Sequence, residues 1–204
     1  IREDGSLIPS SSVGNNKTWV DLADQIILEV NSWQTMEFDG MHDIYYGTAL
    51  PPNRMPIPLI HAGDRIGEPY LHCNLDKVVA VVETNAPDRN TPFASPDATS
   101  KAIAGHIMEF LEHEVKKGRL PENLLPIQSG VGNIANAVLD ELSRSRFENL
   151  SSFTEVLQDG MLKMMNEGKL DMVSATAFSL SPEALDTLMA DLGHYKKKII
   201  LRPQ

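Results

Sequence analysis

The 204-residue chain contains a single cysteine, Cys73, and comparatively few positive charges. One cysteine cannot form an intrachain disulfide, so nothing in the sequence demands an oxidising compartment. The 18 lysines and arginines stand against 28 acidic residues, which gives a formal net charge of −10. A chain with this balance offers no basic field to phosphates, and we therefore expect no nucleic-acid partner.

Long apolar runs and grouped metal ligands are also lacking. No apolar run approaches the roughly 20 residues that are needed to cross a bilayer, so we expect a soluble protein with no membrane partner. The six histidines are scattered singly, and only His106 and His113 share an expected helix. Their separation of roughly two turns is too wide for the usual metal-binding pair on adjacent turns. The sequence therefore predicts no metal site.

Strands and helices alternate along the first half of the chain. We expect a short helix at 18–23, a strand at 26–30 and a β-branched strand at 78–82. The last of these is apolar on both faces, which is typical of a buried parallel sheet. Residues 31–75 form a long irregular stretch, in which four prolines between positions 51 and 58 exclude helix. A stretch of that length is usually functional or packed across another subunit.

The second half carries clearer helix signals. Ser95-Pro96-Asp97 combines a cap, a first-turn proline and an acid, and Gly118 ends the helix that they open. Repeated alternation of strands and helices predicts an α/β fold with mainly parallel open sheets flanked by helices. The further helices are expected at 134–142, 159–168 and 181–192, and the strands at 150–160, 172–178 and 198–204.

A polar, proline-rich segment at 84–92 marks the expected domain boundary. We therefore predict two domains, at 1–90 and 91–204. The chain opens in a turn and closes on an apolar strand, which is unusual for a natural domain. We expect both domains to be incomplete parts of a longer chain.

A glycine-rich turn followed by a lone acid is the most informative pattern. Residues 126–133 read Pro-Ile-Gln-Ser-Gly-Val-Gly-Asn and run into an expected helix, and Glu155 follows within an apolar and hydroxylated strand. Glycines let backbone N–H groups approach a ligand closely, and the helix N-terminus behind them favours negative charge. An acid on an apolar strand needs a partner or a task. Together they predict a carboxylate nucleophile facing an oxyanion-binding turn.

Each half of this pattern also has a purely structural explanation. The glycine turn lacks the Gly-Lys-Ser/Thr ending of a phosphate loop and fits no dinucleotide fingerprint, so a tight strand-to-helix turn explains it equally well. Glu155 can likewise be an edge-strand acid that points into solvent, which is the commoner fate of a lone glutamate.

The turn, the acid and their flanks closely resemble the acetyl-CoA hydrolase/CoA-transferase family, which includes succinyl-CoA:acetate CoA-transferases. In that family a Gly-Val-Gly-Asn turn precedes a strand bearing the catalytic glutamate, and residues 152–160 match that strand. The resemblance covers essentially the whole chain and implies a CoA-transferase-like fold. The other family-like strings are Val13-Gly14-Asn15-Asn16, Met41-His42-Asp43-Ile44-Tyr45, Gly63-Asp64-Arg65-Ile66-Gly67, residues 79–84 and residues 199–204.

The resemblance implies that Glu155 is a nucleophile that forms a glutamyl-CoA thioester, with ping-pong kinetics. It gives oxyanion and substrate-binding roles to Gly130, Val131, Gly132 and Asn133. Among these we expect the main-chain amide of Val131 to be the donor, because each addition step places negative charge on a carbonyl oxygen. Asn133 either holds the substrate carboxylate or caps the helix.

Arg89 is the third candidate for the site. It lies in the polar segment at the domain boundary, where ligand clefts tend to form, and a guanidinium there can clamp a carboxylate or a CoA phosphate. The alternative is a surface pair with Asp88 or another acid. His42 and Asp43 belong to a family-like string, but nothing in the sequence gives them a role.

The implied activity is transfer of CoA between acetyl-CoA or succinyl-CoA and a short carboxylate, with CoA as a substrate and no further cofactor. The alternative is an acetyl-CoA hydrolase that uses the same glutamate, since water can intercept the same intermediates. A non-catalytic CoA-binding segment is a third hypothesis. The partners expected are acyl-CoA, short carboxylates and a second copy of the chain in a homodimer. We expect the cytoplasm as the compartment, with the mitochondrion as the alternative.

Overall fold

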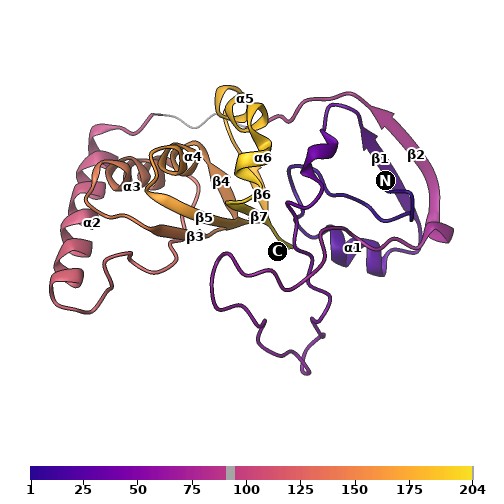
Figure 1. Ribbon diagram of the computed structural model, residues 1–204, viewed down its shortest axis with the longest axis horizontal. Helices are drawn as coiled ribbons and strands as arrows, with labels where there is room; N and C mark the ends of the chain where they lie inside the picture. Colours follow the sequence, from indigo (N-terminus) through magenta and orange to yellow (C-terminus); the bar gives the residue numbers. More distant parts are fainter. Residues whose placement is uncertain (91–94, 204) are drawn as a thin grey trace.

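The computed structural model of the chain describes residues 1–90 and 95–203, and these form an elongated molecule (Figure 1). The first half, residues 1–90, lies at one end and the second half, residues 95–203, at the other. The elements of the first half are α1 (Asn16–Leu22), β1 (Ile26–Asn31), the 3-10 helices η1 (Met36–Phe38) and η2 (Leu75–Lys77), and β2 (Val78–Thr84). Those of the second half are α2 (Ala98–Lys116), α3 (Asn133–Arg144), β3 (Leu150–Phe153), β4 (Val156–Gln158), α4 (Asp159–Asn166), β5 (Leu170–Ala175), β6 (Ala177–Ser179), α5 (Pro182–Ala190), α6 (Leu192–Tyr195) and β7 (Ile199–Leu201).

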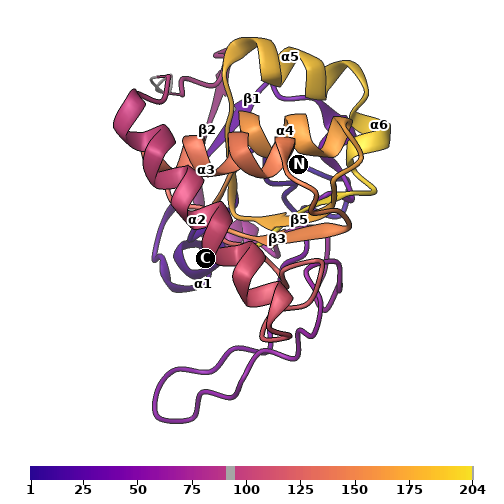
Figure 2. The ribbon, with the colours of Figure 1, turned by 90° about the vertical axis from the view of Figure 1, so that its left-hand side faces the viewer.

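Every pairing between these strands is parallel, as the alternating pattern predicts. The second half contains a three-stranded sheet of order β3-β5-β7 and a two-stranded sheet of order β4-β6. Helices α3, α4 and α5 lie on the same side of the larger sheet (Figures 1 and 2). The predicted α/β class with parallel open sheets flanked by helices is confirmed.

Buried apolar side chains of these helices and strands form one continuous core. Leu139 and Leu142 of α3, Met161 of α4 and Leu188 of α5 are each at most 4% exposed and belong to the same cluster as β7. Their spacing of three or four residues within α3 is the period that places apolar side chains on one helix face. Packing against the sheet thus determines which side of each helix is buried.

Strand β2 shows that the predicted burial of residues 78–82 is wrong in this structure. The strand forms and pairs in parallel with β1, but Val79, Val81 and Val82 are 46% to 56% exposed. The sheet has only two strands, so both of its faces stay open within the described part of the chain. The β-branched composition therefore predicted the strand correctly, and the missing covering layer decides its exposure.

Other boundaries move for local reasons. Asp97, rather than Ser95, caps α2, because its carboxylate accepts a hydrogen bond from the Ser100 amide. Within α2, Phe110 is 60% exposed, while Met108 is buried. The helix expected at 181–192 breaks at Asp191, whose side chain caps the short α6.

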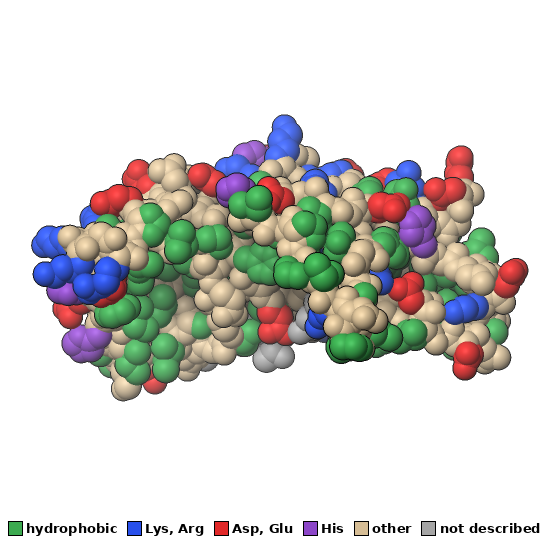
Figure 3. Space-filling view, turned by 90° about the horizontal axis from the view of Figure 1, so that it is seen from below, with side chains coloured by type: hydrophobic (Ala, Val, Ile, Leu, Met, Phe, Trp, Pro, Cys, Tyr) green, Lys and Arg blue, Asp and Glu red, His purple; other side chains and the backbone are tan. Residues whose placement is uncertain are grey.

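Residues 31–75 contain little regular structure, as expected, and part of this stretch hangs as a long loop (Figures 1 and 2). Leu50, Met55 and Ile60 on it are 74% to 83% exposed. Hydrophobic side chains also remain visible over much of the lower face of the molecule (Figure 3). No helix within residues 1–90 and 95–203 is both long and apolar enough to cross a membrane. The division into domains at residue 90 stays a prediction, and residues 91–94 at that boundary lie outside the described part.

Strand β7 joins the two halves. Its residues are fully buried, and besides pairing with β5 it exchanges main-chain hydrogen bonds with the segment around His42. The Leu201 amide donates to the Met41 carbonyl at 3.1 Å, and the Asp43 amide donates to the Leu201 carbonyl at 2.9 Å. The apolar strand that closes the chain is therefore paired on both sides.

A buried ion pair sits at this junction. Asp43 and Arg202 are 2% and 6% exposed, and Arg202 Nη1 contacts the Asp43 carboxylate. The same carboxylate accepts hydrogen bonds from the amides of Ile66 and Gly67, and the guanidinium also donates to the Asp64 carbonyl. The family-like strings at 41–45, 63–67 and 199–204 thus meet at one buried cluster, which is a structural role for Asp43.

Breaking this pair should destabilise the protein strongly. Asp43→Asn leaves the Arg202 guanidinium buried without a counter-charge, and we expect a loss of about 3–5 kcal/mol in the free energy of unfolding. Urea denaturation measures it. The half-exposed Arg2–Asp39 pair is the matched control, and Asp39→Asn should cost less than about 1 kcal/mol. Equal losses for the two variants would contradict the importance of the buried pair.

His42 should make stability depend on pH. Its ring is fully buried, Nε2 lies 2.9 Å from the Ser10 carbonyl, and burial lowers the pKa to about 4. The unfolded chain, with a pKa near 6.5, binds the proton first, so folding free energy is lost as the pH falls from about 6.5 to 4, by about 3 kcal/mol in total. Chemical denaturation at several pH values across this range gives the free energy of unfolding. A plot of that free energy against pH should have a shallower slope for His42→Gln than for the original protein. Parallel pH curves for the two proteins would rule out the titration of His42.

Candidate active site

The glycine turn runs alongside β3, the strand that leads to Glu155. The Ile127 amide donates to the Ser151 carbonyl at 2.8 Å, and the Phe153 amide donates to the Ile127 carbonyl at 2.9 Å. Ile127 therefore pairs with β3 as one isolated step of a parallel strand. This pairing brings the turn and the acid together, although 25 or so residues of sequence, including α3, separate them.

Three side chains from the segment around Glu155 hold the turn. Ser152 Oγ donates to the Ile127 carbonyl at 2.9 Å, and Thr154 Oγ1 donates to the Ser129 carbonyl at 3.1 Å. Gln158 Nε2 donates to the Gly130 carbonyl at 2.9 Å. The side chains of Ser152, Thr154 and Gln158 are all buried, so their donors are held in place and fix the backbone of the turn.

The amide groups beyond the held carbonyls are open. Within residues 1–90 and 95–203, the amides of Gly130, Val131 and Gly132 donate no hydrogen bond, and Val131 is 62% exposed. Gly132 has φ +139°, a conformation that a side chain strains, so glycine is required there. The turn therefore offers a short run of free donors directly before α3, which adds the positive end of its dipole.

Asn133 does not cap the helix, and that interpretation is wrong. The cap position is Gly132, which has no side chain to give, and the Asn133 side chain is exposed at the first residue of α3. The helix starts because the Asn136 amide donates to the Gly132 carbonyl at 3.0 Å. Asn133 is therefore available for a ligand at the same end as the free amides.

Glu155 lies between β3 and β4 rather than inside a continuous strand. Its side chain is exposed, in contrast to the buried Thr154 before it. The parallel pairing continues across the break, because the Thr154 amide donates to the Ser174 carbonyl and the Thr176 amide donates to the Glu155 carbonyl at 2.8 Å. The main chain of Glu155 is thus fixed while its carboxylate stays accessible.

Thr176 connects Glu155 to the first half of the chain. The Val13 amide donates to the Thr176 carbonyl at 2.8 Å, and the Gly14 amide donates to Thr176 Oγ1 at 3.0 Å. The family-like turn at 13–16 therefore abuts the residue that holds the Glu155 carbonyl. The candidate site consequently lies where the two halves meet.

Arg89 lines a different groove. Its exposed side chain shares a hollow of about 880 Å³ with residues of α1 and β1, and no residue of the glycine turn lines that hollow. The alternative of a pair with Asp88 is wrong among the described residues, since the Asp88 carboxylate accepts instead from Ser11 Oγ and Gln34 Nε2. Arg89 is thus free to meet an anion, but no contact links it to Glu155.

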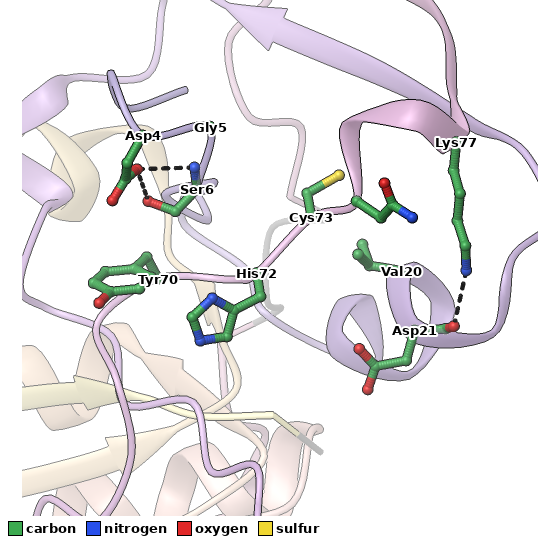
Figure 4. A pocket seen from close by; sticks show the side chains of 10 residues that line it. Asp4, Gly5, Ser6, Val20, Asp21, Tyr70, His72, Cys73 and Lys77 are labelled. Atoms are coloured by element: carbon green, nitrogen blue, oxygen red, sulfur yellow. Dashed lines mark hydrogen bonds between the residues drawn. The ribbon is translucent and has the colours of Figure 1, made fainter.

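A second hollow, of about 430 Å³, lies entirely within the first half and contains Cys73 (Figure 4). Figure 4 shows Lys77 reaching to the main-chain carbonyl of Asp21 and Asp4 accepting from Ser6. Burial raises the pKa of the Cys73 thiol, which keeps it protonated and weakly nucleophilic near neutral pH. Within the described residues no group of three or more histidines, cysteines or acids could hold a metal ion.

Sequence reasoning missed the residues that hold the turn. Alternation along the strand predicts that the Ser152 and Thr154 side chains lie on the opposite face from Glu155, and the structure has them buried while Glu155 is exposed. The alternation alone does not indicate a function for the two hydroxyls. The available signal was the recurrence of hydrogen-bonding side chains at 152, 154 and 158 in a run that also contains the apolar residues Leu150 and Leu157, which are both buried. Chemically, the arrangement presents an exposed carboxylate beside donors suited to a developing negative charge.

Comparison with known proteins gives a consistent result. Residues 1–90 match the acetyl-CoA hydrolase/transferase N-terminal domain. All 204 residues align with succinyl-CoA:acetate CoA-transferase of Clostridium kluyveri at 48% identity, and with acetyl-CoA hydrolase of Neurospora crassa at 45%. The chain spans 38% of the length of each of these relatives.

Two solved structures share the fold. Residues covering 99% of this chain match 42% of a 4-hydroxybutyrate CoA-transferase from Porphyromonas gingivalis with a TM-score of 0.61 and 18% identity. RipA from Yersinia pestis matches over 95% of this chain and 36% of its own, with a TM-score of 0.59 and 21% identity. These two structures show the fold alone. The sequence matches show that residues 1–90 belong to the acetyl-CoA hydrolase/transferase family and that the whole chain is similar to enzymes of that family.

Proposed function

We propose that the protein is a CoA-transferase that moves CoA between a short acyl-CoA, such as acetyl-CoA or succinyl-CoA, and a carboxylate, through a thioester on Glu155. The observation that carries this proposal is the exposed Glu155 carboxylate, which directly follows the residue that holds the glycine turn and its free amides. The relative with 48% identity bears a transferase name, which supports the same choice.

The chemistry needs only a carboxylate nucleophile. A Glu155 carboxylate oxygen attacks the thioester carbonyl, the C–S bond breaks, and CoA thiolate leaves a mixed anhydride on the enzyme. The thiolate then attacks the glutamyl carbonyl, which forms the glutamyl-CoA thioester and releases the first acid as its carboxylate. A second carboxylate reverses both steps and departs as the new acyl-CoA.

Each addition turns a carbonyl oxygen into an oxyanion, and the glycine turn supplies the matching donors. We assign the Val131 amide as the donor and Gly130, Gly132 and Asn133 as the residues that shape and line the site. Loss of one such donor typically costs about 3 kcal/mol of transition-state stabilisation. The exposure of Val131 and the free space around Gly132 support this assignment.

Hydrolysis of acetyl-CoA through the same glutamate is the second candidate, since several relatives with 42% to 45% identity bear that name. In that case water replaces the second carboxylate. The two activities differ in how well the closed site excludes water, and the acceptor dependence of the rate separates them.

The remaining assignments belong to the same proposal. Residues 1–90 would form the end of a first CoA-transferase domain and residues 91–204 the start of a second, catalytic one. Arg89 would clamp a carboxylate or a CoA phosphate, since its guanidinium is exposed and has no acidic partner among the described residues. A homodimer in the cytoplasm, or in mitochondria, completes the proposal.

Removal of the nucleophile should abolish the covalent intermediate. The intact protein incubated with acetyl-CoA should gain the mass of CoA minus one water on the peptide that contains Glu155. Glu155→Gln should show no adduct and lose activity on the order of a thousandfold or more. Glu148→Gln, at another exposed glutamate just before β3, is the matched control. It should form the adduct and keep the activity of the protein without a substitution. An adduct on Glu155→Gln would contradict the assignment.

Acceptor dependence should separate transfer from hydrolysis. In the transferase mechanism the steady-state consumption of acetyl-CoA requires an acceptor such as succinate, and double-reciprocal plots at several acceptor concentrations give the parallel lines of ping-pong kinetics. Consumption of acetyl-CoA at an unchanged rate without any acceptor would instead identify a hydrolase.

A further inference from the structure

Gln158 makes a contact that capping and packing do not explain. Its side chain is 1% exposed, and Nε2 donates to the Gly130 carbonyl at 2.9 Å. Gln158 occupies the cap position of α4, but its side chain makes no capping bond to that helix. The adjacent Leu157 and the nearby Met161 are buried and apolar, so the amide is the exception in its surroundings.

The other end of this amide is unsatisfied. Gln158 Oε1 is buried and has no hydrogen-bond partner among the described residues. A buried acceptor without a partner destabilises a fold, and an apolar side chain of the same shape avoids that cost. An amide at this position is therefore unfavourable if its only task is to fill space in the core. Methionine would fill the same space without the unsatisfied acceptor, but it could not donate the hydrogen bond that Nε2 makes.

The peptide bond links this contact to the proposed oxyanion donor. The Gly130 carbonyl and the Val131 N–H belong to one planar trans peptide, in which the two groups point in opposite directions. A hydrogen bond that fixes the direction of the carbonyl therefore also fixes the direction of the N–H. The carbonyl is held from the buried side by Gln158, so the N–H is turned away from it, on an exposed residue.

We propose that Gln158 is a positioning residue that aims the Val131 amide at the oxyanion by holding the Gly130 carbonyl. This inference rests on the proposed function, because it takes Glu155 as the nucleophile and the Val131 amide as the donor. Gln158 itself touches neither the substrate nor the reacting atoms.

The placement suits this role. Gln158 lies three residues after Glu155, at the end of β4. Thr154 lies directly before Glu155. Both flanking side chains bond to the glycine turn, at Gly130 and at Ser129. Glu155 and the Val131 amide thus belong to two segments that hydrogen bonds hold together. Such preorganisation reduces the rearrangement needed when negative charge develops.

The test compares two variants in the intact protein. Gln158→Met keeps the shape but removes the donor, and it should slow single-turnover formation of the glutamyl-CoA thioester by about 10- to 100-fold. The acetyl-CoA concentration that half-saturates this single-turnover rate should change less than about twofold, because ground-state binding does not use the oxyanion. The thermal midpoint should stay equal or rise, since the unsatisfied Oε1 is gone.

Gln158→Glu adds a readout that a structural role would not move. An ionised glutamate cannot donate to the Gly130 carbonyl, whereas a protonated one can. The ratio of the Gln158→Glu rate to the Gln158→Met rate should therefore rise as the pH falls. A ratio that is independent of pH would overturn the proposal.

A control and two further outcomes complete the design. Ser143→Ala removes a half-buried hydrogen bond from α3 to Glu167 and should leave the rate of thioester formation unchanged. Thioester formation by Gln158→Met at the unmodified rate would overturn the role of Gln158 while Glu155 stands. Thioester formation by Glu155→Gln would instead overturn the proposed function itself, so the two failures are distinguishable.

Discussion

The parallel pairing of β5 with both β3 and β7 is the interaction on which the rest of the structure depends. On one side it aligns β3, and with it the glycine turn that pairs through Ile127. On the other side it seats β7, which carries Arg202 into the buried cluster with Asp43. Beyond the end of β5, Thr176 holds the Glu155 carbonyl and accepts amides from the first half. One strand therefore connects the candidate site to both halves.

In the candidate site, hydrogen bonds fix the backbone of the glycine turn while its amide groups stay accessible to a ligand. The glycine turn has little side-chain packing of its own, and the Gly132 conformation is costly for other residues. Its carbonyls are bound by Ser152, Thr154 and Gln158 from inside, which leaves the amides facing outward. A site that stabilises an oxyanion needs this combination, because donors that must first reorient contribute less in the transition state.

The two halves differ in how complete their sheets are. In the second half helices cover one side of the β3-β5-β7 sheet, and most residues of its strands are buried, in β7 all of them. In the first half β1 and β2 pair in the correct parallel sense but remain exposed on their valines. Parallel sheets are normally covered on both faces, so the composition of β2 and its exposure are in conflict within the described residues.

The sequence by itself determined the element types, the parallel α/β class and the family, because periodicity, capping residues and the Gly-Val-Gly-Asn and Glu155 strings are local features of the chain. It also identified Glu155 and the glycine turn as a pair. Only the tertiary structure decided what joins them: Gln158 and Thr154 read as ordinary strand residues until pairing with Ile127 places the turn beside them. The same holds for Asp43, whose partner Arg202 is 159 residues away. Contacts between distant segments depend on how the sheets pack, and no local pattern encodes that packing.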